Sequence, residues 1–270
     1  MISKHLDYKG PVPLNVWRKV AIATWKTTKD PSIYGFVDLD AGPLLTKIEE
    51  ARKRGIRLTP TIVMAKAIAH GIARYPSFNS ILRWGKLYER KTIDIFLQVS
   101  AVENGEENLS GTVVREADRK SLEQILEELH HKAKRIRSNE DPEFKSIKSR
   151  LRHVPSWIIA RVLDTVSFVT HTLNLWSPFL GTPRDPFGSA MVTSVGGMGL
   201  EYGFAPLVPY SRCPMVLAIG KISERPVVEN GQMVIKPMLP VSVTLDHRLI
   251  DGYGCSKILE GLKEYLKHPH

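Results

Sequence analysis

One histidine in this chain is placed where it could act as a catalytic base. The apolar run 239–245 predicts a strand, and Asp246, His247 and Arg248 follow it directly. A histidine at the end of a strand can face a cleft, and its near-neutral pKa lets it accept a proton at pH 7. Asp251 and Gly252 follow, at the start of a predicted helix. The spacing His-x3-Asp-Gly is weak evidence by itself, because a histidine there can simply cap that helix.

Helices and strands alternate around this histidine. Periodicity predicts strands near 33–39, 86–89, 93–102, 109–114, 189–195, 214–222 and 238–245, with a hairpin turn at Asn230-Gly231. Helices are predicted over 16–29, 42–54, 59–74, 121–137 and 252–267. Thr59 and Ser121 are expected to cap the third and fourth of these helices. The mixture of elements predicts an α/β or α+β fold.

Composition is that of an ordinary globular protein. Apolar residues make up 43% of the 270 residues and charged residues 24%. Cys213 and Cys255 lie far apart with no Cys-x-x-Cys spacing, so we expect neither a disulfide framework nor a zinc site, and no metal. The N-terminus has no signal-peptide pattern, and we expect a cytoplasmic location.

The formal charge of +10 restricts the partners only loosely. A basic chain can bind nucleic acid, an anionic membrane or an anionic cofactor, and it can equally have a basic solvated surface. Neither zinc-finger spacing nor an RNP-like aromatic strand accompanies the charge, so no nucleic-acid partner is expected.

Five ordered segments resemble one known family, the catalytic domain of 2-oxo acid dehydrogenase E2 acyltransferases, which is grouped with chloramphenicol acetyltransferase. The segments are 16–21, 108–122, 191–199, 213–220 and 245–252, and the last holds the His-x3-Asp-Gly motif. The resemblance implies a chloramphenicol-acetyltransferase-like mixed sheet flanked by helices, in a single domain over 1–270. It also implies a homotrimer with its active site at the interface between subunits.

The resemblance further implies CoA-dependent acyl transfer and a role for particular residues. His247 would act as general base on the thiol of CoA or of the acceptor. Ser194 would donate a hydrogen bond to the tetrahedral oxyanion, with Thr193 as the alternative if the alignment is off by one. Asp251 would pair with Arg18 of the opening helix and support the site. The residues that bind CoA stay unknown.

Three hypotheses about function stay open. The first is an acyltransferase that uses a CoA thioester and an acceptor thiol, amine or hydroxyl. The second is an E2 core that works with a lipoyl domain or another carrier protein on a separate chain, since we expect no covalent lipoate here. The third is a non-catalytic trimeric scaffold, which the retention of His247, Ser194 and Asp251 disfavours. The missing apolar tail predicts a simple trimer, not a cage.

Residues 138–188 are an expected insertion relative to the compact family domain. Charged residues interrupt its apolar run, which excludes a transmembrane span. Apolar positions at helical spacing predict one buried face, made of Ile158, Ile159, Val162, Leu163, Val166, Val169 and Leu173. Arg161, Asp164, Thr165, Ser167, His171 and Asn174 are expected on the opposite face. We expect this helix to pack on protein, over the acyl end of a substrate channel, and a peripheral membrane contact is not favoured.

Overall fold

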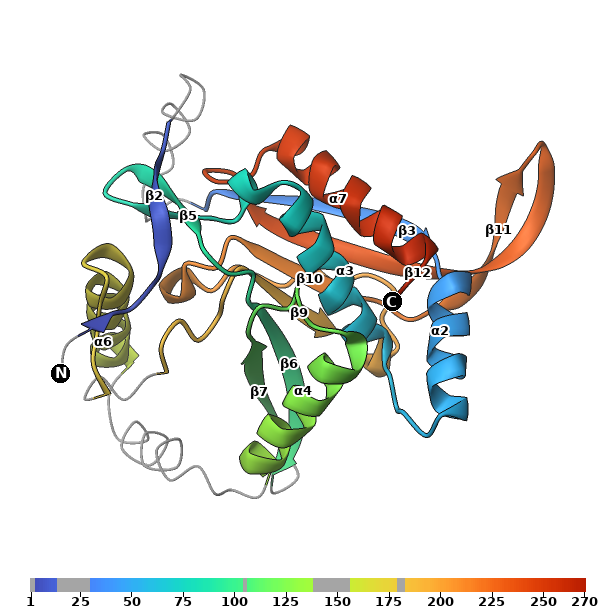
Figure 1. Cartoon of the computed structure of the whole chain (residues 1–270), viewed down its shortest axis with the longest axis horizontal. Helices are drawn as coiled ribbons and strands as arrows, with labels where there is room; N and C mark the ends of the chain where they lie inside the picture. The colour runs from blue at the N-terminus through green and yellow to red at the C-terminus, as the bar shows by residue number, and fades with distance from the viewer. Residues whose placement is uncertain (1–2, 14–29, 104–105, 138–155, 179–182) are drawn as a thin grey trace.

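The computed structural model describes residues 3–13, 30–103, 106–137, 156–178 and 183–270 (Figure 1). Arg18 and the expected helix 16–29 lie outside the described residues, as do residues 138–155 of the expected insertion.

A mixed sheet forms the centre of the described fold. Its strand order is β11-β12-β10-β9-β6-β7, and β3 also pairs with β12. β9 runs parallel to both β10 and β6, whereas the other pairs are antiparallel. The bounds are Ser32–Asp40 (β3), Ile95–Glu103 (β6), Glu106–Val114 (β7), Ala190–Ser194 (β9), Met215–Ile219 (β10), Ser223–Glu229 (β11) and Gln232–Asp246 (β12). The expected mixed sheet is confirmed.

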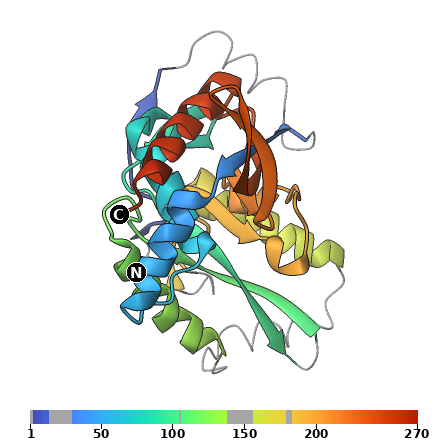
Figure 2. The same cartoon turned by 90° about the vertical axis from the view of Figure 1, so that its right-hand side faces the viewer.

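Helices cover one face of this sheet, as the two views at right angles show (Figures 1 and 2). They are α2 (Gly42–Lys53), α3 (Pro60–Arg74), α4 (Leu122–Arg137) and α7 (Gly252–Lys267). α3 lies on β6 and β9, α4 lies on β7, and α7 packs against α3. The apolar side chains of α3 and of the strands beneath it make up most of the buried core.

The helix ends follow the predicted capping chemistry. The Thr59 hydroxyl accepts a hydrogen bond from the Ile62 amide at 3.4 Å, at the start of α3. Ser121 and Gln124 bond each other's backbone amides at 3.2 and 2.9 Å, which is a capping box. These bonds satisfy amides that the first helical turn leaves without partners.

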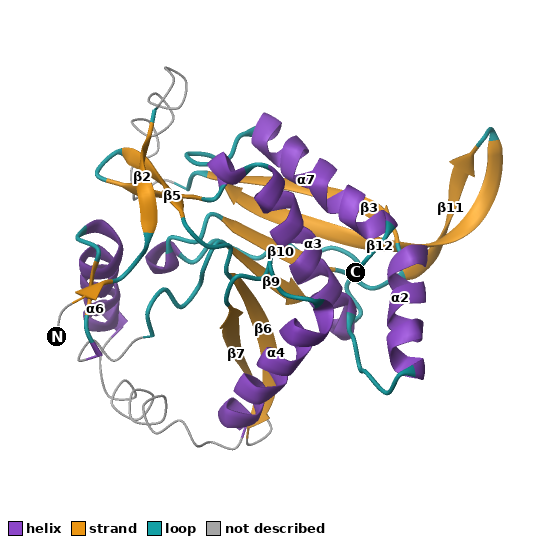
Figure 3. Cartoon of the chain, viewed as in Figure 1, coloured by secondary structure: helices purple, strands orange, loops and turns teal. Residues whose placement is uncertain are grey.

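The structure has short strands that were not predicted, and it joins two predicted segments into one strand (Figure 3). The strands that were not predicted are β1 (Ser3–Lys4), β2 (Tyr8–Val12), β4 (Ser80–Arg83) and β8 (Leu175–Trp176); β4 joins β5 (Lys86–Arg90) and β2 in a small sheet. β12 is one strand of 15 residues where the sequence predicted a hairpin arm and a separate strand. Asn230 and Gly231 both have positive φ, so the two-residue turn lets the hairpin strand continue without a break into the main sheet.

The insertion helix has the predicted orientation only in part: Arg161, Asp164 and Thr165 are exposed as expected, but so is Val162. α6 (Ser156–Ser167) continues into a π-helical turn, η2 (Phe168–Thr172), and β8 (Leu175–Trp176) follows. Its buried residues are polar, namely Ser167, Thr170, His171 and Asn174, whereas Val162 is 51% exposed. A π turn holds more residues than an α turn, so it shifts the residues after α6 around the axis. None of the helices that the structure describes is long and apolar enough to cross a membrane.

Candidate active site

His247 sits in a tight turn that is fixed from both sides. Its backbone amide donates to the Pro31 carbonyl at 2.9 Å, and the next residues, Leu249 and Ile250, are buried. The ring Nδ1 lies 3.3 Å from the Ile250 carbonyl oxygen. Because a carbonyl oxygen only accepts, this contact favours the tautomer with the proton on Nδ1 and the lone pair on Nε2. That is the form a general base needs.

A part-buried ion pair joins the two residues on either side of the histidine. The Asp246 carboxylate binds the Arg248 guanidinium through both oxygens, at 2.9 Å for Nε and 2.7 Å for the terminal nitrogen. It also accepts from the Arg248 amide at 2.9 Å. A two-point ion pair of this kind holds the backbone on both sides of His247 in one geometry.

Asp251 caps the last helix. Its side chain accepts from the Gly254 amide at 2.8 Å, which fixes the start of α7 beside the turn of His247. The predicted partner, Arg18, lies outside the described residues, so the expected ion pair stays a prediction.

Ser194 ends β9 and is exposed. The chain then turns through η4 (Gly196–Met198). A Cβ on Gly196 would lie 2.6 Å from the carbonyl oxygen of Gly220, so only glycine lets these two backbones approach. Thr193, the alternative oxyanion donor, is half-buried one residue earlier.

The structure does not bring His247 and Ser194 together within one chain. Ser194 lies beside Ile219 at one end of β10, whereas Leu245, just before the histidine, lies beside Met215 at the other end. Four residues of strand separate these points by about 13 Å along the axis. A base and an oxyanion donor must both lie within about 3 Å of the reacting groups, so one chain cannot supply both to one substrate.

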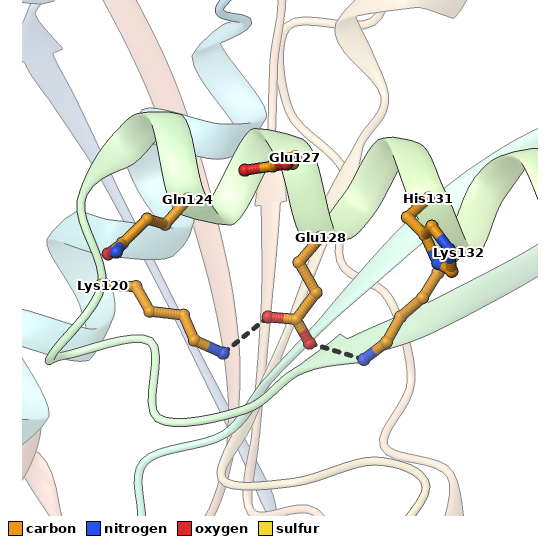
Figure 4. A pocket seen from close by; sticks show the side chains of 6 residues that line it. All are labelled: Lys120, Gln124, Glu127, Glu128, His131 and Lys132. Atoms are coloured by element: carbon orange, nitrogen blue, oxygen red, sulfur yellow. Dashed lines mark hydrogen bonds and ion pairs between the residues drawn. The ribbon is translucent and has the colours of Figure 1, made fainter.

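One surface pocket contains neither His247 nor Ser194. It lies on α4 and is lined by Lys120, Gln124, Glu127, Glu128, His131 and Lys132 (Figure 4). Burial opposes the charge of Glu128, but hydrogen bonds from Lys120 and Lys132 outweigh it and lower the pKa of that carboxyl. Both lysine ammonium groups lie 2.6 Å from its oxygens. The Glu128 carboxylate of this pocket is thus paired with two of the lysines that line it.

A second group of polar side chains was not predicted from the sequence. His5, His171 and Asp185 are all buried, and one potential ligand atom from each lies within 4.8 Å of the others. Their separation in sequence left no local spacing to recognise, and His171 was predicted on the outer face of its helix.

The chain matches one known protein family over most of its length. Residues 9–142 and 187–270 match the model of the family described as 2-oxoacid dehydrogenases acyltransferase (catalytic domain). The lipoamide acyltransferase component of the branched-chain alpha-keto acid dehydrogenase complex of Bacillus subtilis (strain 168) is 24% identical over 264 residues. That alignment covers 95% of this chain and 52% of the relative, so the chain spans about half the length of that protein.

Solved structures show the same fold. A probable dihydrolipoamide acetyltransferase from Listeria monocytogenes 4b F2365 superposes with a TM-score of 0.66 at 20% identity, covering 96% of this chain and 94% of that one. A chloramphenicol acetyltransferase superposes with a TM-score of 0.53 at 13% identity, covering 93% and 96%. At these identities the likeness establishes the fold.

Proposed function

The chain belongs to the 2-oxoacid dehydrogenase acyltransferase catalytic-domain family, and on that premise we propose that it moves an acyl group between CoA and an acceptor thiol, with His247 as general base. The observation that carries the proposal is the His247 ring, held at the end of β12 by the Ile250 carbonyl, inside a segment that the family match covers. The relative's name, lipoamide acyltransferase, favours a dihydrolipoyl thiol as the partner of CoA.

The reaction follows from the tautomer of His247. Its Nε2 takes the proton of the attacking thiol, and the sulfur forms a bond to the thioester carbonyl carbon. The carbonyl oxygen becomes an oxyanion, to which the Ser194 hydroxyl donates; such a donor is worth roughly 2.7–4 kcal/mol in the transition state. Collapse of the intermediate breaks the original carbon–sulfur bond, and the imidazolium returns its proton to the departing thiolate.

We place the active site between two copies of the chain. The separation of His247 from Ser194 supports this arrangement, because a neighbouring copy would have to supply the second residue. The surface of β3 supports it as well. Tyr34 and Phe36 are 57% and 68% exposed, beside the part of β12 that leads to His247. Large exposed aromatic side chains on a regular strand are typical of a surface that another subunit covers.

The test is an acyl-transfer assay on the purified chain. A series of acyl-CoAs is offered with and without dihydrolipoamide, and release of CoA thiol is measured. We expect release that depends on dihydrolipoamide, and a fall of roughly 10²–10⁴-fold in His247→Ala. His130→Ala removes an exposed histidine on α4 and should leave turnover unchanged.

Two results would contradict the proposal. One is a folded wild-type chain that transfers no acyl group to dihydrolipoamide or to any other thiol. The other is a folded His247→Ala variant that keeps the wild-type rate.

A further inference from the structure

A buried cluster of two histidines and one aspartate lies outside the proposed active site. His5 follows β1 (Ser3–Lys4), His171 lies in η2, and Asp185 lies in the loop before β9. They are 1%, 4% and 6% exposed. Figure 1 shows β1 lying against α6, so three distant parts of the chain meet here. Among the residues that the structure describes, no other group of three such side chains converges in this way.

The hydrogen bonds of His171 leave its Nε2 as a buried acceptor. The Thr170 hydroxyl donates its one proton to the Val166 carbonyl at 2.8 Å. Its contact with His171 Nδ1, at 2.9 Å, must therefore be donated by the ring. The lone pair of His171 is then on Nε2, which is buried and has no hydrogen-bond partner. A metal-binding histidine typically has this arrangement, with one nitrogen anchored and the other directed at the ion.

Asp185 and His5 add two further acceptors. One oxygen of Asp185 accepts from Arg90, whereas its Oδ1 is buried without a partner. The Asp185 amide donates to His5 Nε2 over 3.3 Å, so the lone pair of His5 is on Nε2 and its buried Nδ1, which has no partner, carries the proton. Two unsatisfied lone pairs, on His171 Nε2 and Asp185 Oδ1, thus gather in a dry place. His5 would supply the third by exchanging its long bond to the Asp185 amide for a bond to the ion.

The protonation states suit a metal. Burial lowers the pKa of His5 to about 4 and that of His171 to about 3, so both rings are neutral at pH 7. Burial opposes the charge of Asp185, but Arg90 and Arg115 outweigh it, and its pKa is lowered. Neutral imidazole and ionised carboxylate are the forms that bind metal ions.

Most of the surrounding positive charges form ion pairs. Arg90, Arg115 and Arg184 pair with Asp185, Asp94 and Asp7 respectively. Arg212, whose charge also acts on His171, donates to the Ser167 hydroxyl at 3.3 Å. Arg90 would then act as the outer partner that orients the Asp185 carboxylate, as is usual for a ligating carboxylate.

We propose that His5, His171 and Asp185 bind a divalent transition-metal ion, with Zn²⁺ the best fit to the ligand set. Two imidazoles and one carboxylate are a common zinc combination, with water as the fourth ligand. Bonds of about 2.1 Å hold tetrahedral ligand atoms about 3.4 Å apart. The present spacing, within 4.8 Å, needs only a small closure. The expectation of no zinc site was drawn from the cysteines alone and did not consider these residues.

The ion would cross-link the N-terminal strand to the segment that the family match leaves out. That segment, 143–186, supplies His171 and Asp185, whereas His5 comes from the N-terminal strand. Other contacts between them are mostly polar: Asn174 bonds the Leu6 amide and carbonyl at 2.6 and 3.0 Å, and β1 pairs with β8. With little apolar burial to hold this junction, a metal would supply the cross-link.

The experiment measures metal on the full chain, expressed without a polyhistidine tag. After loading with Zn²⁺ and removal of the excess, mass spectrometry of the metal should give about one zinc per chain. Co²⁺ loading should produce the visible absorption of a tetrahedral site. His171→Gln should weaken Zn²⁺ binding by at least roughly tenfold. His70→Gln is the matched control, because His70 Nε2 is also buried without a partner but belongs to no such cluster.

Two outcomes would overturn the proposal. The first is a folded wild-type chain that keeps less than about one tenth of an equivalent of zinc, which would mean that water alone fills the cluster. The second is a His70→Gln variant that loses as much zinc as His171→Gln does. A wild-type measurement guards against misfolded variants: Zn²⁺ should raise the melting temperature and slow amide exchange over 156–176, and a chelator should reverse both. None of these readouts depends on acyl transfer.

Discussion

At the scale of single residues, Asp251 is expected to stabilise the turn of His247 in two ways, and substitutions can separate them. Its carboxylate caps α7 through the Gly254 amide, 2.8 Å away. From the family resemblance we also expect an ion pair with Arg18, which lies outside the described residues. Asparagine keeps an oxygen that can cap the helix but removes the charge, whereas alanine removes both.

We expect Asp251→Asn to lower the free energy of unfolding by about 3 kcal/mol, because it leaves the arginine without its partner. Asp251→Ala should cost about 1 kcal/mol more, the usual value of a lost cap. Urea unfolding of both variants provides the measurement. If Asp251→Asn is as stable as the wild type, the role of Asp251 is limited to the cap.

His247 and Asp251 could be predicted because their relation is local: a strand end, a turn and a helix start lie within a few residues. The cluster of His5, His171 and Asp185 could not be predicted. Its members meet only through the tertiary fold, and no spacing in the sequence encodes that contact.

At the scale of elements, the core helices α3 and α7 meet through glycines. A Cβ on Gly71 of α3 would lie 2.5 Å from the Ile258 carbonyl oxygen of α7. A Cβ on Gly261 would lie 2.8 Å from the Gly71 Cα. The backbones of α3 and α7 therefore touch directly, and this contact fixes the position of the helix that follows the catalytic turn.

Gly71→Ala should therefore destabilise the protein by about 1–3 kcal/mol, since the added methyl group must push the helices apart. Gly197→Ala is the control, because its Cβ would meet no atom within 4 Å. Thermal unfolding of the two variants tests the contact. Equal melting temperatures would show that α3 and α7 can move apart at little cost.

Capped helices such as α3, α4 and α7 were predictable because the cap and the periodicity lie in the same short segment. The face of the segment after α6 was not, since the apolar spacing predicted burial of Leu173 and exposure of His171, and the structure has the reverse. The hydrogen bonds between Asn174 and Leu6, together with the π turn, orient this segment by its polar side instead.

At the scale of the whole molecule, the buried Cys213 thiol and Tyr265 hydroxyl make the free energy of unfolding depend on pH in the alkaline range. Burial raises the pKa of Cys213 from 9.0 to about 12 and that of Tyr265 from 10.0 to about 12. Between these values the unfolded chain loses protons that the folded chain keeps. Stability contributed by both groups is therefore complete below pH 9 and is lost as the pH rises toward 12.

The melting temperature should accordingly fall by roughly 5 °C or more between pH 9 and pH 11. Tyr265→Phe should reduce that fall, because it removes one of the two titrating groups. Scanning calorimetry over this range gives the answer, and a melting temperature that does not change would show that neither group is protected by the fold.

The assembly decides whether the account of the active site is right. The predicted homotrimer has a mass of about 91 kDa, three times the 30.4 kDa chain. In the closed ring of three chains that we propose, each interface would pair His247 of one copy with Ser194 of the next. The mixed sheet could be predicted from local strand patterns and the family resemblance, whereas contacts between chains depend on surfaces such as that of β3.

Mixing two inactive variants tests the central claim most directly. His247→Ala and Ser194→Ala chains are each expected to be nearly inactive, and they are unfolded together, refolded as random trimers and assayed. If each site takes its histidine and its serine from different chains, roughly one site in four regains both residues, and the mixture should recover about a quarter of wild-type turnover. A mixture no more active than its two parents would contradict a site shared between subunits.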